Sequence, residues 1–172
     1  MRIFHIPAYT DNYIWVMQSG SDISIIDPGD ASPVLDHIKN NDLNIVDILL
    51  THHHFDHVGG TLELKKHISG KVYGPVGDIN GVDIQVSEND EVKTLDYKFS
   101  VLETPGHTLD HIAYVEKRKQ LVFCGDTLFS AGCGRVFEGT FEQMHNSIQK
   151  LNQLDPELSL IHISEPTRLR SI

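Results

Sequence analysis

Residues 51–60 read THHHFDHVGG, a stretch that holds four histidines and an aspartate between positions 52 and 57. The apolar run 45–50 precedes it and predicts a buried strand that ends where the histidines begin. Loops that follow rigid strands are a common place for ligand-binding side chains. In such a loop, histidines two residues apart can converge on one metal ion, and the Asp-His pair can converge on a second. The alternative is a surface patch of histidines that binds nothing.

Two later predicted strands also end in polar residues that can bind metal. The run 99–103 leads into TPGHT, which contains His107, and the run 121–124 leads into GDT, which contains Asp126. Alone, a loop histidine or a Gly-Asp turn is usually structural. Together with the cluster, His107 supplies a third nitrogen for one ion, and Asp126 supplies a carboxylate that can bridge two. The sequence therefore predicts a site for two metal ions.

The remaining pattern alternates short strands with helices. Strands are predicted at 2–6, 13–18, 23–27, 45–50, 72–73, 82–86, 91–95, 98–103, 112–116 and 121–124. Helices are predicted at 32–41, where Ser32 is the expected N-cap before a proline at the first helical position, at 61–68 and at 140–154. Gly59 and Gly60 fit a tight turn before the second helix, although packing explains them equally well. This order of elements predicts an α/β layered sandwich.

The composition is that of one soluble domain. The chain has 172 residues, of which 40% are hydrophobic and 22% charged, and its formal net charge is −10. The acidic balance opposes nucleic-acid binding, and no apolar run approaches the roughly 18 residues of a membrane span. The N-terminal residues lack the apolar core of a signal peptide, so we expect a cytoplasmic protein with no membrane partner. Cys124 and Cys133 are then expected to stay reduced and to pack without binding metal.

These segments resemble those of the metallo-β-lactamase-fold hydrolases, and within them the chain is similar to the glyoxalase II (hydroxyacylglutathione hydrolase) proteins. The matching segments are DNYIW at 11–15, IDPGD at 26–30, THHHFDHVGG at 51–60, TPGHT at 104–108 and CGDTLFSAGCGRVFEGT at 124–140. The resemblance implies a four-layer αββα sandwich that forms one catalytic domain over residues 1–163. It also implies that residues 164–172 are an atypical tail, and that the C-terminal helical domain of the relatives is missing from a truncated chain.

The resemblance assigns roles to individual residues. It implies two divalent ions, which we expect to be zinc with iron or manganese as alternatives. The first ion would be held by His52, His54 and His107, and the second by Asp56 and His57, with Asp126 bridging both. Asp56 would also act in catalysis with a metal-bridging hydroxide, while Arg135 and Phe137 would contact glutathione. Two neighbours have other expected roles: Asp27 accepts the ring N–H of a ligating histidine, or merely forms a turn, and His53 points away from the ions.

The implied reaction is hydrolysis of the thioester of S-(2-hydroxyacyl)glutathione, such as S-D-lactoylglutathione, to glutathione and a 2-hydroxy acid such as D-lactate. In the cell it would serve methylglyoxal degradation, and we expect a monomer. Two alternatives are a truncated metal-binding fragment without activity and a glutathione persulfide dioxygenase of the same fold. A nuclease is opposed by the acidic charge, and a β-lactamase would more typically have cysteine in place of Asp126.

One segment departs from the resemblance. Relatives complete the second metal site with a histidine in a Gly-His-Glu-Tyr-Thr-like stretch, whereas residues 160–167 read LIHISEPT and place Ser164 at that position. His162 lies two residues earlier, a displacement of about 6.6 Å along a strand. We therefore expect the second ion to bind weakly.

Overall fold

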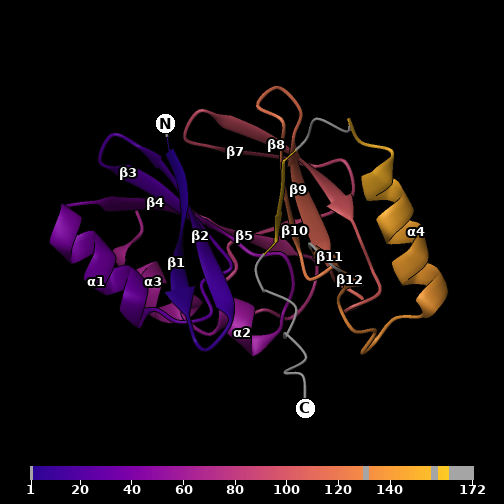
Figure 1. Cartoon of the computed structure of the whole chain (residues 1–172). Coiled ribbons are helices and arrows are strands. Elements are labelled where there is room, and N and C mark those ends of the chain that lie inside the picture. Colours follow the sequence, from indigo (N-terminus) through magenta and orange to yellow (C-terminus); the bar gives the residue numbers. More distant parts are fainter. Residues whose placement is uncertain (1, 130–131, 156–158, 163–172) are drawn as a thin grey trace, which may run out of the picture.

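The computed structural model describes residues 2–129, 132–155 and 159–162. Two β-sheets pack face to face, and helices cover their outer faces (Figure 1). This arrangement is the expected four-layer αββα sandwich. Residues 164–172, which we expected to form an atypical tail, lie outside the described residues.

The first sheet is built entirely from the N-terminal half of the chain. Its neighbouring strands are β1 (Arg2–Ala8), β2 (Asn12–Ser19), β3 (Asp22–Ile26), β4 (Asn44–Leu49), β5 (Val72–Pro75) and β6 (Ile84–Val86). The first three strands run antiparallel, and the last three continue parallel to β3. Helix α1 (Ser32–Asn41) makes the crossover that parallel pairing of β3 and β4 requires. The carboxyl ends of these parallel strands therefore meet at one edge of the sandwich.

The second sheet comes from the C-terminal half. Its strand order is β13-β10-β9-β8-β7, formed by β7 (Glu91–Thr94), β8 (Tyr97–Glu103), β9 (Ile112–Glu116), β10 (Leu121–Gly125) and β13 (Ser159–His162). Helix α4 (Phe141–Asn152) connects β10 to β13, which pair in parallel. A short hairpin of β11 (Leu128–Phe129) and β12 (Gly132–Cys133) stands apart from both sheets.

Three apolar clusters hold the layers together. The central cluster lies between the sheets and includes Met17, Ile26 and Leu49 from the first sheet with Phe99, Tyr114 and Phe123 from the second. A second cluster packs α1 and α3 against the first sheet through side chains such as Val34 and Leu64. A third packs Leu151 of α4 against the second sheet. Burial of these side chains on both faces of both sheets makes each strand a rigid support for the loop at its end.

Most predicted elements are confirmed, with differences that have local causes. The expected helix 61–68 is instead α3 (Thr61–Leu64) followed by the 3₁₀ turn Lys65–His67, and a separate helix α2 (Phe55–Val58) forms within the histidine stretch. Strand β3 ends before Asp27, because that residue adopts a left-handed φ of 49°. Ser32 is not the N-cap, a position that Ala31 takes without a side-chain hydrogen bond. In contrast, α4 begins with a capping box between Thr140 and Gln143.

Candidate metal centre

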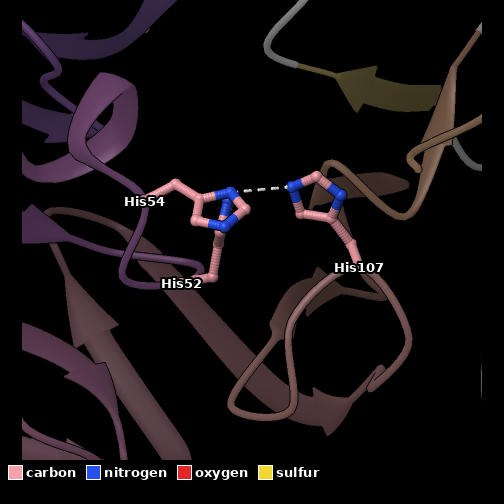
Figure 2. Close-up of side chains that lie close together, drawn as sticks. All are labelled: His52, His54 and His107. Carbon is pink, nitrogen blue, oxygen red and sulfur yellow. Dashed lines mark hydrogen bonds between the residues drawn. The ribbon is translucent and has the colours of Figure 1, made fainter. Parts of the chain in front are cut away.

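The six predicted metal ligands meet at the edge of the sandwich where strands from both sheets end. His52 and His54 follow β4, and Asp56 and His57 lie in α2. From the second sheet, the loop between β8 and β9 contributes His107, and Asp126 follows β10 directly. Figure 2 shows three of the imidazoles, with His52 and His54 on one side and His107 reaching toward them from the other.

Three histidines form one half of this group. The ligand nitrogens of His52, His54 and His107 all lie within 4.8 Å of one another. His107 Nε2 is 2.9 Å from His54 Nδ1 (Figure 2). Three imidazole nitrogens at this spacing can reach a single divalent ion after small rotations of the rings.

The aspartates and His57 form the other half. His57 Nε2 lies 3.6 Å from Asp56 Oδ2 and 3.4 Å from Asp126 Oδ1. The other oxygen of Asp126, Oδ2, lies 3.4 Å from His107 Nε2. Asp126 thus presents one oxygen to each half of the group, which is the placement that a bridging carboxylate needs.

Several buried atoms at this place have no hydrogen-bond partner among the described residues. They are His52 Nε2, His57 Nε2 and Asp126 Oδ1. Buried polar atoms are normally hydrogen-bonded, because an unsatisfied one costs about 1–3 kcal/mol. Imidazole nitrogens and carboxylate oxygens are the ligands that zinc, iron and manganese accept. The residues present therefore fit divalent cations, which would satisfy all three atoms.

Asp27 accepts the ring N–H of a predicted ligand, His57, as expected from the sequence. Its Oδ2 lies 3.1 Å from His57 Nδ1 and accepts the Thr51 hydroxyl at 2.6 Å, while Oδ1 accepts the Thr51 backbone N–H at 2.7 Å. Burial lowers the pKa of His57, but the hydrogen bond to Asp27 and the charges of Asp27, Asp126 and Asp56 together outweigh burial and raise the pKa to about 9. Because Nδ1–H donates to Asp27, the Nε2 atom is the one directed toward the two other carboxylates.

The hydroxyl of Thr51 also settles the tautomer of His52. That hydroxyl has one hydrogen, which it gives to Asp27, so it must accept from His52 Nδ1 at 3.0 Å. The lone pair of His52 then lies on Nε2, facing the site. Burial, together with the neighbouring histidines, holds the pKa of His52 well below its usual range. His52 is therefore neutral, as a metal ligand must be.

Asp56 is oriented by a residue of the DNYIW segment. Asn12, buried at the start of β2, donates from Nδ2 to Asp56 Oδ2 at 2.9 Å. Burial raises the pKa of Asp56, but the charge of His57 and the Asn12 hydrogen bond outweigh it, so the net pKa is lowered. Asp56 is therefore a carboxylate whose Oδ2 accepts from Asn12 and also faces His57 Nε2.

The double glycine lets α2 lie directly on the turn that carries Asp27. A Cβ at Gly60 would lie 2.5 Å from the backbone nitrogen of Ala31, and one at Gly59 would lie 2.6 Å from the Gly29 oxygen. Any larger residue would push the two segments apart. Of the two explanations left open by the sequence, close backbone packing is the one that these distances support.

The two predicted substrate contacts lie on one loop beside the histidines. His107 Nδ1 donates to the backbone oxygen of Arg135 at 2.7 Å, and the Arg135 side chain is exposed. The ring of Phe137 is edge-on to His54 and His107, with centroids 5.6 and 5.3 Å away, and this residue is 62% exposed. Both side chains are thus available to a molecule bound over the histidines.

His111 was not identified from the sequence, although it is buried within the site. Its Nε2 accepts the backbone N–H of Asp126 at 3.1 Å, so its proton lies on Nδ1, which is 2.8 Å from Thr104 Oγ1. Its ring also stacks on His52 at 4.8 Å. Gly125 has a φ of 49°, and a Cβ there would lie 2.7 Å from His111 Nε2. In the sequence, the signal for this histidine is its position four residues after His107.

Three further expectations concern residues near the site. His53 contacts Asp110 and Glu138 and lies outside the three-histidine group of His52, His54 and His107, although its ring centroid is 5.1 Å from that of His54. Cys124 and Cys133 are free thiols, and Cys124 is buried, as expected of a packing residue, with its pKa raised by burial to about 12. The expectation that Cys133 packs is wrong, because this residue is exposed on the short strand β12. Ser164, which stands where relatives have a metal-binding histidine, lies outside the described residues. For His162 the structure gives only the backbone, which lies in β13 and pairs with Gly125 of β10.

With this geometry established, comparisons with known proteins define the class. The chain belongs to the metallo-beta-lactamase superfamily, whose family model matches residues 10–80 and 71–160. Its curated relatives include hydroxyacylglutathione hydrolases from Ectopseudomonas mendocina, 46% identical over 90% of this chain, and from Vibrio cholerae, 46% identical over 97%. Within the superfamily the chain thus belongs to the hydroxyacylglutathione hydrolase family. It spans 62% and 67% of the length of these two relatives.

Solved structures of the superfamily match the fold. ETHE1 from Myxococcus xanthus is 28% identical with a TM-score of 0.85, over 98% of this chain and 77% of that one. TTHA1623, solved in a di-iron-bound form, is 27% identical with a TM-score of 0.76, over 94% and 91%. The BLEG-1 B3 metallo-beta-lactamase, 24% identical with a TM-score of 0.84 over 96% and 92%, supports the fold alone. Across the described residues, none of the helices has the length and apolar character needed to cross a membrane.

Proposed function

We propose that this chain hydrolyses the thioester of S-(2-hydroxyacyl)glutathione, with S-D-lactoylglutathione giving glutathione and D-lactate in methylglyoxal degradation. The observation that carries the proposal is the convergence of buried, unsatisfied ligand atoms from His52, His57 and Asp126 in a chain of this family. These atoms come from both sheets, so their meeting is a property of the whole fold.

The proposed ligand set follows the geometry of the two halves. One ion would be held by His52, His54 and His107, the second by Asp56 and His57, and Asp126 would bridge them. We expect zinc, with iron or manganese as alternatives. When bound, two such ions supply a hydroxide at neutral pH and polarise the thioester carbonyl. Ser164 stands where a further histidine would be expected, so the second ion is the weaker one.

The chain's own residues would position the reacting groups. Asp56, held in place by the hydrogen bond from Asn12 to its Oδ2, would orient the attacking hydroxide. The leaving thiolate comes from a thiol of pKa about 8.5, so it departs without a dedicated general acid. Catalysis then depends on orientation of the nucleophile rather than on protonation of the leaving group.

Glutathione would bind over the loop that carries Arg135 and Phe137. The exposed guanidinium of Arg135 can pair with a glutathione carboxylate. The exposed ring of Phe137, beside His54 and His107, can pack on the thioester end of the substrate. We further propose a cytoplasmic monomer, which is consistent with the free thiols of Cys124 and Cys133.

Two other functions share this geometry. A glutathione persulfide dioxygenase of the same fold would hold one iron per chain, and it is the second candidate because it shares parts of the ligand pattern. A metal-binding fragment without activity would follow if Ser164 leaves the second site too weak.

Metal loading and thiol release together separate these functions. The protein would be stripped with a chelator, reloaded with zinc, iron or manganese, and assayed for thiol release from S-D-lactoylglutathione, with His54→Ala as the control. Two ions per chain with release above the control support the hydrolase. One iron per chain with oxygen consumption from glutathione persulfide supports the dioxygenase. One ion with neither reaction supports the fragment and overturns the proposal.

A further inference from the structure

Three loops surround the candidate metal centre. The ligand loop, residues 51–57, carries His54, the histidine loop, residues 104–111, carries His107, and the substrate loop, residues 132–139, carries Arg135 and Phe137. The last two loops are joined by their backbones, because the Phe137 N–H donates to the His107 oxygen at 3.2 Å and the Gly139 N–H donates to the Gly106 oxygen at 3.2 Å. They therefore form one unit on the second sheet.

His53 connects the ligand loop to that unit through both of its ring nitrogens. Nδ1 lies 2.9 Å from Asp110 Oδ1 in the histidine loop, and Nε2 lies 3.0 Å from Glu138 Oε1 in the substrate loop. The side chain is 38% exposed, so it has partly left water to make these contacts. His53 therefore connects the ligand loop to two different loops of the second sheet.

Both carboxylates are fixed by further hydrogen bonds. Asp110 Oδ1 accepts the Thr108 hydroxyl at 2.6 Å, and Glu138 Oε2 accepts the Leu109 backbone N–H at 3.0 Å. Glu138 thereby joins His53 to the backbone of the histidine loop. Because Asp110 and Glu138 are already held in place, their contacts with His53 cost little further side-chain conformational entropy.

Glu138 is the residue next to Phe137, whose ring lies against His54 and His107. Any displacement of Glu138 therefore moves Phe137 relative to the histidines. We propose that His53 is a positioning residue: it holds the substrate loop in register with the ligand loop, and so determines affinity for the glutathione thioester without binding metal. This inference rests on the proposed function for the identity of the substrate.

The test compares His53→Ala, Glu138→Gln and the double variant with His145→Ala, which removes an exposed histidine from α4. On S-D-lactoylglutathione we expect KM to rise roughly 3- to 10-fold in each single variant, as for a partly exposed charge-assisted contact. The double variant should be no worse than the worse single one, since the residues act as a pair. Zinc content and kcat should stay near those of the unaltered protein.

Amide hydrogen exchange gives a readout that needs no activity. The Leu109 and Phe137 amides should exchange severalfold faster in His53→Ala and at the original rate in His145→Ala. If KM and both exchange rates are unchanged in His53→Ala, or if its zinc content falls with its activity, the positioning role is wrong. If the unaltered protein releases no thiol but exchange still rises, the positioning role stands and the proposed hydrolase function fails.

Discussion

Two buried polar clusters each join the first sheet to the second, and they differ in how their atoms are satisfied. In the Asp47 cluster, Asp47 accepts the Lys71 N–H at 2.8 Å and the Thr94 hydroxyl at 2.6 Å, and Ser24 completes the set with a 2.6 Å contact to Thr94. In the metal centre, ligand atoms of His52 and Asp126 have no such partners. The first cluster joins β3 and β4 to β7 with the protein's own atoms, whereas the second is complete only with a ligand.

Hydrogen-bond satisfaction distinguishes a structural polar cluster from a ligand site, whereas burial does not. Asp47 and His52 are both buried, at 6% and 0% exposure. A satisfied carboxylate between two sheets stabilises their packing, but unsatisfied atoms lower stability unless something binds them.

Asp126→Asn should break the metal centre without weakening the fold. Loss of the bridging carboxylate should reduce thiol release on the order of 10²- to 10³-fold and lower the number of bound ions. The melting temperature of the chelator-treated protein should not fall, because burial raises the pKa of Asp126 and so disfavours its charged form there. Metal analysis and a thermal melt test both parts; a lower melting temperature would contradict the contrast.

Asp47→Ala should have the opposite pattern. The Lys71 N–H and the Thr94 hydroxyl lose their acceptor, so the free energy of unfolding should fall by roughly 1–3 kcal/mol. Urea denaturation measures this loss. Metal content under folding conditions should be unchanged, and Ser24→Ala, which removes only the end of the network, should cost less than Asp47→Ala. Equal losses in the two variants would show that Asp47 is not the centre of the cluster.

His111→Ala tests whether the metal centre extends beyond its ligands. The Asp126 backbone N–H loses its acceptor, so affinity for the weaker ion should fall about tenfold. His111→Gln keeps an acceptor near the position of Nε2 and should recover part of that affinity. Competition with a metal-sensitive dye reads out both variants. An equal loss in both would mean that the ring fills space and does not position Asp126.

Asn12→Ala should give the smallest effect. One hydrogen bond to a ligating carboxylate is lost, which should lower kcat about fivefold while the first ion stays bound. Gln18→Ala is the matched control, since Gln18 lies on the same strand and its amide donates to the Gly20 oxygen in an exposed hydrogen bond, away from the site. A kcat unchanged from that control would show that Asp56 keeps its orientation without Asn12.

Much of the fold follows from patterns within single segments. Apolar runs and turn residues predict most strands, and the spacing of Phe141, Met144, Ile148 and Leu151 predicts α4, because these signals depend on neighbours in the chain. The helix at 61–68 was wrong in its extent. There, the stretch from residue 55 must fit against the turn at Gly29, and that contact lies beyond the reach of local periodicity.

The residues of the candidate site likewise divide into those that the local sequence identifies and those that only the folded structure reveals. His52, His54, Asp56 and His57 were identifiable because they are close together in sequence, and Asp27 because its turn precedes them. His111 escaped notice because its importance comes from a backbone N–H fifteen residues away and from the tight fit against Gly125. The pairing of His53 with Glu138 was equally hidden, since it joins loops on different sheets.

The division of the sandwich into two sheets has a consequence for biosynthesis. Strands β1–β6 are complete at Val86, so every strand of the first sheet is synthesised before any strand of the second. At that stage the nascent chain already contains His52, His54, Asp56 and His57. His107 and Asp126 arrive only with the second sheet. Until then the early histidines are an open half-site, so full metal affinity appears only when the second sheet has docked.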